Sequence, residues 1–332
     1  MFISFKQLNM KASFRAKANI ALIKYWGKSN KNLNLPSTGS ISITLDSLYS
    51  DTEIIFTDGL DRDYLYIDGK EDISQPYRLS SCLDLIRKEA KINNYAMIRS
   101  NNNFPTASGL ASSASGFAAI TMAASKALDL NLSKRQLSVI ARHGSGSAAR
   151  SIYGGFVEMI LGKKTDGTDS FAKQLSPSTH WPLEVVIAIT DIRNKKIDSR
   201  SAMNLSSSTS PYYKDWIRDS SAELAMAREA IIKKDFEALS IVSQSNCLKM
   251  HSVIMTTQPP IVYWNKATLS CIDLIIDLQK SGIPVFFTID AGPQVKAICE
   301  PIFTNKVSSL LKEVSGVKNI IISKLDNSLD IF

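Results

Sequence analysis

The sequence has few residues that could build a metal centre or a disulfide framework. Its 332 residues include four cysteines and three histidines, with neither a C-x-x-C pair nor an H-E-x-x-H motif. A structural zinc site needs closely spaced ligands, and a disulfide framework needs the cysteine density of small secreted domains. We therefore exclude both and expect the cysteines to be reduced residues of the core.

Long hydrophobic runs are also missing. No apolar stretch approaches the ~18 residues that a membrane-spanning helix requires, and the opening MFISF is too short for the core of a signal peptide. Hydrophobic residues make up 44% of the chain and charged residues 21%, as in ordinary globular proteins. The sequence therefore predicts a cytoplasmic protein that does not associate with membranes.

Acidic residues are scarce at the start of the chain, where seven lysines and arginines precede the first one, Asp46. The net charge of +8 fits either a nucleic-acid-binding protein or an enzyme for strongly anionic small molecules. The chain has no RNA-recognition aromatic motif, zinc finger or arginine-rich tail, which favours the enzyme. Lys24 and Lys28 also favour it, because they interrupt the otherwise apolar segment IALIKYWGK.

A run of small residues occupies positions 101–119, NNNFPTASGLASSASGFAA, and leads into an alanine-rich pattern that predicts a helix ending near Leu128. Small side chains let a phosphate approach the backbone, and the unpaired N–H groups of a first helical turn attract an anion. The alternative is an ordinary tight turn before a buried helix. The segment is neither a Walker A loop nor a dinucleotide-binding G-x-G-x-x-G motif.

The first half of the chain reads as β-strands with a few helices. Asp68 and Gly69 are typical of a tight hairpin turn. Ser133 and Gln136 predict a capping box at the start of a helix. Besides the alanine-rich helix, strands are predicted at 41–45, 52–56 and 96–99, and helices at 80–90 and 133–142.

The pattern changes near residues 181–184, where the buried-strand segment PLEVVIAITDI begins, and we place a domain boundary there. Ser210 and Pro211 are a suitable N-cap and first residue for a following helix. Several helices with few strands fit an α+β second domain. Helices are predicted at 210–234, 235–255 and 261–280, a further helix opens at Gly292 and Pro293, and strands are predicted at 284–289 and 317–323.

The segment PTASGLASSAS resembles the P-x-x-x-G-L-x-S-S-A nucleotide loop of the galactokinase, homoserine kinase, mevalonate kinase and phosphomevalonate kinase (GHMP kinase) superfamily. Ala111 stands where most members have Gly, which points to one branch, the diphosphomevalonate decarboxylases. The resemblance covers about residues 12–325 in collinear order. Four further segments carry it: NIALIKYWGK (19–28), RHGSGSAARSIYGGF (142–156), SRSAMNLSSSTS (199–210) and FFTIDAGPQVK (286–296).

This resemblance implies an α/β, GHMP-kinase-like two-domain fold with the active site in the cleft between the domains. The N-terminal domain (12–183) would be ribosomal-S5-domain-2-like and the C-terminal domain (184–332) ferredoxin-like α+β. The implied activity is the ATP- and Mg²⁺-dependent decarboxylation of mevalonate 5-diphosphate to isopentenyl diphosphate, by a homodimer. Two sibling activities stay open: decarboxylation of the monophosphate, and phosphorylation of mevalonate without loss of CO₂. A nucleic-acid-binding protein is the alternative from a different class, because the superfamily shares the fold of its first half with a ribosomal domain.

The resemblance also implies roles for single residues. Asp290 is the implied catalytic carboxylate, with Lys24 and Arg150 completing a charged triad, although by position alone Asp290 could cap a helix. The planar fork of Arg150 suits the substrate carboxylate. The implied substrate-binding residues are Tyr25, Lys28, Ser145, Gly146, Ser147, Arg150, Ser199 and Arg200. The implied ATP-binding residues are Pro105, Ser108, Gly109, Leu110, Ala111, Ser112 and Ser113, and the hydroxyl of Ser113 is also the implied metal ligand.

Overall fold

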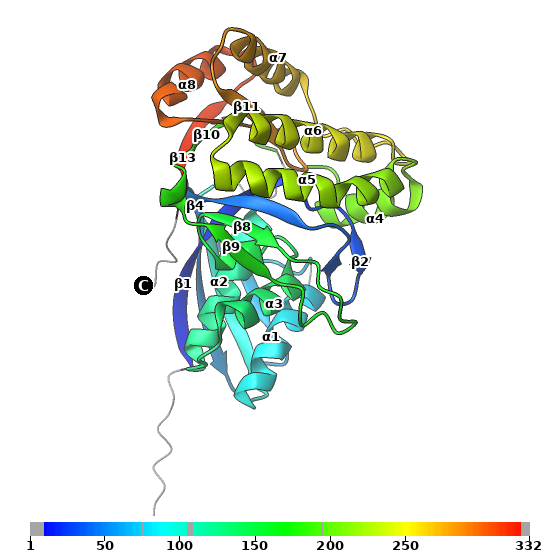
Figure 1. Cartoon of the computed structure of the whole chain (residues 1–332). Helices are drawn as coiled ribbons and strands as arrows, with labels where there is room; N and C mark the ends of the chain where they lie inside the picture. The colour runs from blue at the N-terminus through cyan, green and yellow to red at the C-terminus, as the bar shows by residue number, and fades with distance from the viewer. Residues whose placement is uncertain (1–9, 75, 105–108, 194, 327–332) are drawn as a thin grey trace, which may run out of the picture.

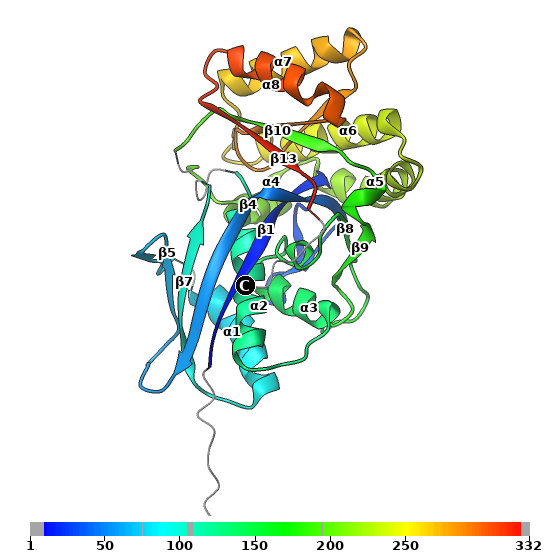
Figure 2. The ribbon, with the colours of Figure 1, turned by 90° about the vertical axis from the view of Figure 1, so that its left-hand side faces the viewer.

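The computed structural model describes residues 10–74, 76–104, 109–193 and 195–326, which form two sheets with their helices (Figures 1 and 2). The first sheet has the order β6-β5-β7-β4-β8-β9, and β1 also pairs with β4. A small hairpin of β2 and β3 lies apart from it. The strands are β1 (Lys11–Ile23), β2 (Lys28–Asn30), β3 (Leu35–Pro36), β4 (Ser40–Thr57), β5 (Tyr64–Ile67), β6 (Lys70–Glu71), β7 (Tyr95–Asn102), β8 (Phe156–Met159) and β9 (Ala172–Ser176).

Strand β4 organises the first sheet, because its 18 residues pair with three neighbours. Its first part pairs with β8, its second part with β7, and β1 runs antiparallel along both. Three helices and the short η1 pack around a core of mainly alanine, leucine and isoleucine side chains beneath this sheet. These elements are α1 (Pro76–Ala90), α2 (Ser112–Ala127), α3 (Lys134–Gly144) and η1 (Arg150–Ile152).

The second sheet is antiparallel, with the order β11-β12-β10-β13. Its strands and helices follow one another as β, helices, β, β, helix, β, which is the ferredoxin-like arrangement. A short η2 (Ser178–His180) precedes it. The elements are β10 (Glu184–Ile189), α4 (Ser199–Thr209), α5 (Tyr213–Lys233), α6 (Phe236–Met255), α7 (Lys266–Lys280), β11 (Val285–Ile289), β12 (Val295–Cys299), η3 (Pro301–Phe303), α8 (Thr304–Glu313) and β13 (Asn319–Lys324).

The second sheet is buried on both faces, as period-two alternation along β10 shows. Val186 and Ala188 pack in a core with residues of α7 and α8. Val185 and Ile187 point the other way, into a core that also contains residues of β1, β4, α5 and α6. One of the hydrophobic clusters is therefore shared by the two halves of the chain.

Several local predictions are confirmed. Ser133 and Gln136 form the capping box of α3. Asp68 and Gly69 form the turn between β5 and β6, both with positive φ. The four cysteines are free thiols and buried. Each feature depends on residues a few positions apart or on simple burial, which is why sequence patterns reveal it.

The prediction that Ser210 and Pro211 begin a helix is wrong. The chain is already helical from Ser199, because the side chain of Asp198 accepts hydrogen bonds from the next backbone N–H groups and caps α4. Ser210 is the C-cap of α4, and α5 begins at Tyr213. A serine followed by proline suits a helix start, but here it separates two helices.

The prediction that Gly292 and Pro293 open a helix is also wrong. After β11 the backbone turns tightly, with the N–H of Gly292 donating to the carbonyl of Asp290, and enters β12. The pairing of Ile289 with Val295 makes β11 and β12 a hairpin. Asp290 is therefore not a helix cap but the residue at the start of this hairpin loop.

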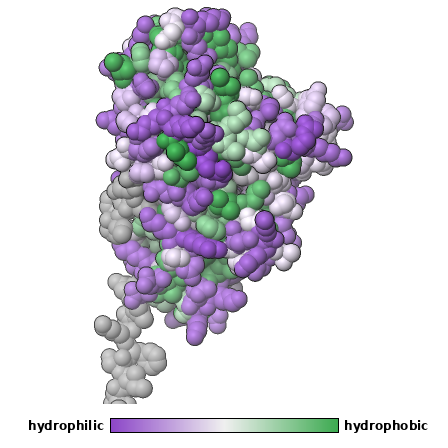
Figure 3. Space-filling view, viewed as in Figure 1, coloured by the Kyte–Doolittle hydropathy of each residue, from purple (hydrophilic) through white to green (hydrophobic). Residues whose placement is uncertain are grey.

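Hydrophilic side chains cover much of the surface seen in Figure 3, with apolar areas between them. The exposed large apolar residues include Met226 and Ile232 on α5 and Ile241 and Leu248 on α6.

None of the helices in the described part of the chain has the length and apolar character that crossing a membrane requires.

Candidate active site

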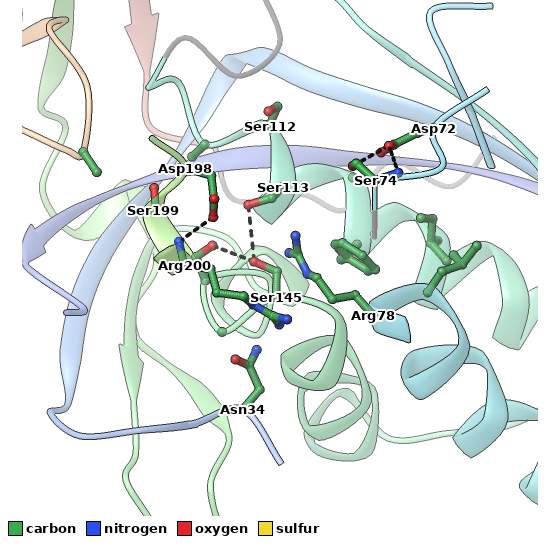
Figure 4. A pocket seen from close by; sticks show the side chains of 18 of the residues that line it. Asn34, Asp72, Ser74, Arg78, Ser112, Ser113, Ser145, Asp198, Ser199 and Arg200 are labelled. Carbon is green, nitrogen blue, oxygen red and sulfur yellow. Dashed lines mark hydrogen bonds between the residues drawn. The ribbon is translucent and has the colours of Figure 1, made fainter. Parts of the chain in front are cut away.

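A pocket of about 460 Å³ lies where the two halves of the chain meet. Its wall includes the end of β1, the N-terminal turns of α1, α2 and α4, the loop before η1 and the loop after β11 (Figure 4). Pro105 and Ser108 lie outside the described residues, and the buried side chain of Leu110 belongs to the core. The other predicted site residues all line this pocket: Lys24, Tyr25, Lys28, Gly109, Ala111, Ser112, Ser113, Ser145, Gly146, Ser147, Arg150, Ser199, Arg200 and Asp290.

Asp290 forms an ion pair with Lys24, whose Nζ lies 2.7 Å from Oδ1. Lys24 is 1% exposed and also donates to the carbonyl of Ala21, so its ammonium group is fixed by two partners. A second lysine, Lys296, lies 3.3 Å from Oδ2. Burial disfavours the ionised carboxylate, but the two lysines outweigh it and hold the pKa of Asp290 well below its usual range.

Arg150 is buried and held by polar groups of the first domain. Its guanidinium donates to the hydroxyls of Ser40 and Ser42 and to the amide oxygen of Asn19. In the described part of the chain, Asp290 forms ion pairs with the two lysines and not with Arg150. Arg150 also lines the pocket, and the charge of Asp290 acts on its guanidinium without a direct ion pair. Burial lowers the pKa of Arg150 to about 10, which leaves it fully charged at neutral pH.

The N-terminal end of α2 points into the pocket. Ala111 adopts a left-handed conformation with φ of 61°, and its side chain makes no capping hydrogen bond. The hydroxyl of Ser113 lies 3.4 Å from that of Ser145, which in turn lies 3.2 Å from that of Ser147. The positive end of a helix and several converging hydroxyls together suit the binding of a phosphate.

Three cationic side chains, Lys28, Arg78 and Arg200, meet in another part of the pocket, and Figure 4 shows both arginines extending into it. Burial and the charges of the two arginines lower the pKa of Lys28 to about 7. The buried hydroxyl of Tyr25 has no hydrogen-bond partner among the described residues, and burial raises its pKa to about 12. Such a group of cations beside a neutral hydroxyl suits a ligand with several negative charges.

Lys195 connects the start of α4 with the loop after β11. Its Nζ donates to the hydroxyl of Ser199 at 2.8 Å and to the carbonyl of Ala291 at 3.1 Å. Burial lowers the pKa of Lys195 to about 8, although Asp198 and Asp290 oppose this effect. The lysine therefore adds a further positive charge between the cation group and Asp290.

Sequence reasoning missed Arg78, Lys195 and Lys296 as site residues. Arg78 lies in the first turn of α1, where a cation opposes the helix dipole. The predicted helix begins only at residue 80, so the sequence pattern did not reveal this unusual position. Lys296 interrupts the buried apolar strand β12, which was a usable signal. Lys195 stands in a surface-like run of basic residues, and no sequence feature separates it from its neighbours.

The oxygen ligands that this pocket offers fit a magnesium ion that binds together with a nucleotide. Among the described residues there is no cluster of three or more histidine, cysteine or acidic side chains that could hold a metal. Mg²⁺ in phosphoryl-transfer sites keeps several waters and is bound largely by substrate phosphates, so it needs few protein oxygens. The hydroxyls of Ser112 and Ser113, at the start of α2, can supply them.

Comparison with known proteins agrees with this geometry. Residues 16–172 match the family model of the diphosphomevalonate decarboxylase-like N-terminal domain, and residues 185–328 match that of the mevalonate 5-diphosphate decarboxylase C-terminal domain. The diphosphomevalonate decarboxylase of Debaryomyces hansenii is 35% identical over 96% of this chain and 88% of its own length.

Solved structures of similar chains extend the comparison. The mevalonate diphosphate decarboxylase of Staphylococcus aureus has a TM-score of 0.89 and 37% identity, covering 97% of this chain and 98% of its own. A similar chain solved in complex with MVAPP, AMPPCP and magnesium also has a TM-score of 0.89, with 35% identity over 97% of this chain and 98% of its own.

The fold and the pocket define a two-domain α/β enzyme of the GHMP kinase type. Within that class, the chain belongs to the diphosphomevalonate decarboxylase family. The fold predicted from the sequence is thus confirmed.

Proposed function

We propose that this protein catalyses the ATP-dependent decarboxylation of (R)-mevalonate 5-diphosphate to isopentenyl diphosphate, ADP, phosphate and CO₂, in the mevalonate pathway of isoprenoid biosynthesis. The observation that carries the proposal is the Asp290–Lys24 pair, which lies in one pocket with the N-terminus of α2 and the cation group. A carboxylate for the substrate hydroxyl, donors for a triphosphate and cations for a diphosphate are the three components that this reaction needs.

On the nucleotide side, Leu110 would contribute only its backbone, because its side chain is in the core. The other residues that would bind ATP are Pro105, Ser108, Gly109, Ala111, Ser112 and Ser113. The N–H groups at the start of α2 would bind phosphate oxygens. Mg²⁺, held by the phosphates and Ser113, would neutralise charge on the group being transferred.

On the substrate side, Lys28 and Arg200 would hold the 5-diphosphate together with Arg78 and the hydroxyl of Tyr25. Ser145, Gly146, Ser147 and Ser199 would complete this binding site. Arg150, fixed by Asn19 and two serines, would bind the substrate carboxylate bidentately.

Asp290 would orient the tertiary 3-hydroxyl and accept its proton as the phosphoryl group arrives. A weak base suffices, because phosphoryl transfer passes through a loose transition state in which positioning matters more than basicity. The bond between C3 and the oxygen of the resulting phosphate ester would then break, and phosphate would leave with the bonding electrons. The electron pair of the bond that joins the carboxylate to the adjacent carbon would form the new double bond as CO₂ departs. Lys24 would neutralise negative charge at this centre.

One assay tests the proposal and separates it from its siblings. Purified protein is incubated with MgATP and, in separate reactions, mevalonate, its 5-phosphate and its 5-diphosphate, while ADP, phosphate and CO₂ are measured. We expect the three products in equal amounts and only with the 5-diphosphate. Turnover of the 5-phosphate would identify a phosphomevalonate decarboxylase, and ADP without CO₂ from mevalonate would identify a mevalonate 3-kinase.

We also propose a domain boundary between residues 183 and 184, a cytoplasmic location and a homodimer. The first sheet ends with β9 and the second begins with β10, which supports the boundary.

Exposed apolar residues on α5 and α6 support the proposed homodimer. Light scattering during size-exclusion chromatography tests the homodimer, and a mass of one chain would contradict it.

A further inference from the structure

Lys296 is a buried lysine in an apolar strand. The side chains of Val295, Ala297 and Cys299 pack on one face of β12 against the core formed with α7 and α8. By the alternation of the strand, Lys296 points to the opposite face, where Ile298 belongs to the core shared with the first domain. A buried lysine requires compensation for its lost hydration, so its partners indicate why it is there.

Those partners lie on two different parts of the pocket wall. The Nζ atom of Lys296 donates to the carbonyl of Gly109, at 2.9 Å, and lies 3.3 Å from Oδ2 of Asp290. Gly109 precedes α2 in the predicted phosphate-binding segment, whereas Asp290 is the predicted catalytic carboxylate. Lys296 itself does not line the pocket and is 1% exposed, so it contacts both parts from behind.

The two loops that Lys296 connects are also packed backbone to backbone. Gly109 has φ of +88°, and a Cβ there would lie 3.0 Å from the Cα of Gly292. Little space remains for either loop to shift independently. Burial and the charge of Lys24 lower the pKa of Lys296, while Asp290 raises it.

We propose that Lys296 is a positioning residue that locks the Asp290 carboxylate to the phosphate-binding segment at Gly109. Its ammonium group forms an ion pair with Oδ2 and a hydrogen bond to the carbonyl of Gly109. The carboxylate that would accept the hydroxyl proton therefore keeps a constant position relative to the nucleotide site. An uncharged side chain of similar length would fill the same space but would bind neither the carboxylate nor the carbonyl. The proposal rests on the function proposed above.

The matched pair of variants is Lys296→Met and Ile298→Met. Methionine keeps the length and apolar packing of the lysine stem but removes the charge. Ile298 lies two residues along on the same face of β12 and contributes to the shared core, so its variant reports general disturbance of the strand. The stability of both variants is compared by thermal unfolding.

In Lys296→Met we expect kcat to fall at least tenfold, a size typical of removing a group that orients a reacting side chain, with KM values within about threefold of the native ones. Ile298→Met should keep kcat within about twofold. If Lys296→Met also keeps kcat within twofold, or if both variants lose kcat and thermal stability in parallel, Lys296 has no positioning role.

A second measurement does not depend on turnover. The pKa of Asp290 is followed by ¹³C NMR of aspartate-labelled protein, with Asp290→Asn assigning the resonance. Removal of one of two cations should raise that pKa in Lys296→Met and leave it unchanged in Ile298→Met. The other titratable groups around Asp290 are the same in both variants: Lys24, Arg150, Lys195, Cys247 and His251.

The kinetic and NMR measurements distinguish failure of the proposed function from failure of the role proposed for Lys296. Native protein that forms no products from MgATP and mevalonate 5-diphosphate would refute the proposed function, while the NMR arm would still decide whether Lys296 acts on Asp290. An unchanged Asp290 pKa in Lys296→Met would overturn the inference even in a fully active enzyme.

Discussion

At the scale of single residues, the chemistry of the site depends on charges that burial has brought together. Asp290 stays ionised across the neutral range because Lys24 and Lys296 lower its pKa more than burial raises it. The carboxylate therefore does not gain or lose a proton near pH 7 in the free protein, and any pH dependence of binding in that range must come from another group.

The variant Asp290→Asn tests the role of that charge. Asparagine keeps the shape but cannot accept the hydroxyl proton, so ADP formation should fall by roughly 10²- to 10⁴-fold, the range for removal of a general acid or base. MgATP binding, measured by calorimetry, should persist because the predicted nucleotide contacts lie before α2 and in its first turn. Near-native ADP formation would show that Asp290 does not act on the hydroxyl.

Lys28 is a pocket residue whose charge should change near neutrality. Its pKa is lowered to about 7, first by burial and then by Arg200 and Arg78. If Lys28 binds the diphosphate as proposed, its charged form should do so, and KM for mevalonate 5-diphosphate should rise as pH increases above about 7, with KM for ATP changing less. In Lys28→Arg this rise should disappear, because arginine stays charged. A KM profile in Lys28→Arg identical to the native one would assign the titration elsewhere.

At the scale of elements, the start of α2 shows how backbone conformation shapes the nucleotide site. Gly109 and Ala111 both have positive φ, and at Gly109 an added Cβ would lie 3.0 Å from the Cα of Gly292. Gly116, within α2, would meet nothing within 4 Å if it carried a Cβ. The same substitution should therefore have opposite effects at Gly109 and Gly116.

Gly116→Ala should stabilise the protein by about 0.5–1 kcal/mol, the usual gain for replacing glycine inside a helix. Gly109→Ala should destabilise it by at least ~1 kcal/mol, because alanine is strained at that φ and its Cβ would press on Gly292. Chemical denaturation measures both. Equal effects at the two positions would contradict the proposed contact between the loops.

Helix α4 is held in place by two tryptophans. The indole N–H of Trp26 donates to the buried hydroxyl of Ser206, and that of Trp216 donates to the carbonyl of Trp26. Since α4 begins with the predicted substrate residues Ser199 and Arg200, this anchor sets where they lie. Ser206 does not line the pocket, but its hydrogen bond to Trp26 helps to position the start of α4.

Ser206→Ala should leave the Trp26 N–H unpaired and lower the free energy of unfolding by ~1–3 kcal/mol. We expect KM for the diphosphate substrate to rise more than KM for ATP, because Arg200 shifts with the helix. The control is Ser207→Ala, since Ser207 is exposed and its hydroxyl bonds only within α4. If the two variants behave alike, the tryptophan anchor does not position the site.

At the scale of the whole molecule, the two sheets are joined by a common core. Ile41 and Leu45 of β4 lie in the same cluster as Val185 of β10 and Phe286 of β11. The domains of such a protein cannot separate without exposing apolar surface, so they should unfold together.

Calorimetry should therefore show one thermal transition, with the calorimetric and van't Hoff enthalpies equal. Phe286→Leu, in the shared core, should lower the temperature of that single transition without splitting it. Two resolved transitions in the native protein would mean that the shared cluster contributes little to stability.

The sequence by itself determined the features that depend on nearby residues. The capping box of α3, the β5–β6 hairpin turn and the alternation in β10 follow from chemistry within a few positions. Motifs similar to a known family also indicated the site residues, and 14 of them line one pocket. Element starts were less secure, because Ser-Pro and Gly-Pro pairs suit several kinds of turn.

Only the tertiary structure determined which charged and polar groups are in contact. Lys24 and Asp290 are 266 positions apart, and Lys296 and Gly109 are 187 apart, so no local pattern relates them. These contacts exist because β1, α2 and the β11–β12 hairpin pack around one pocket. The same packing determines the burial and the neighbouring charges that shift each pKa. Burial and charge separation are properties of the packed chain, since electrostatic interactions depend on distance and surroundings rather than on sequence order.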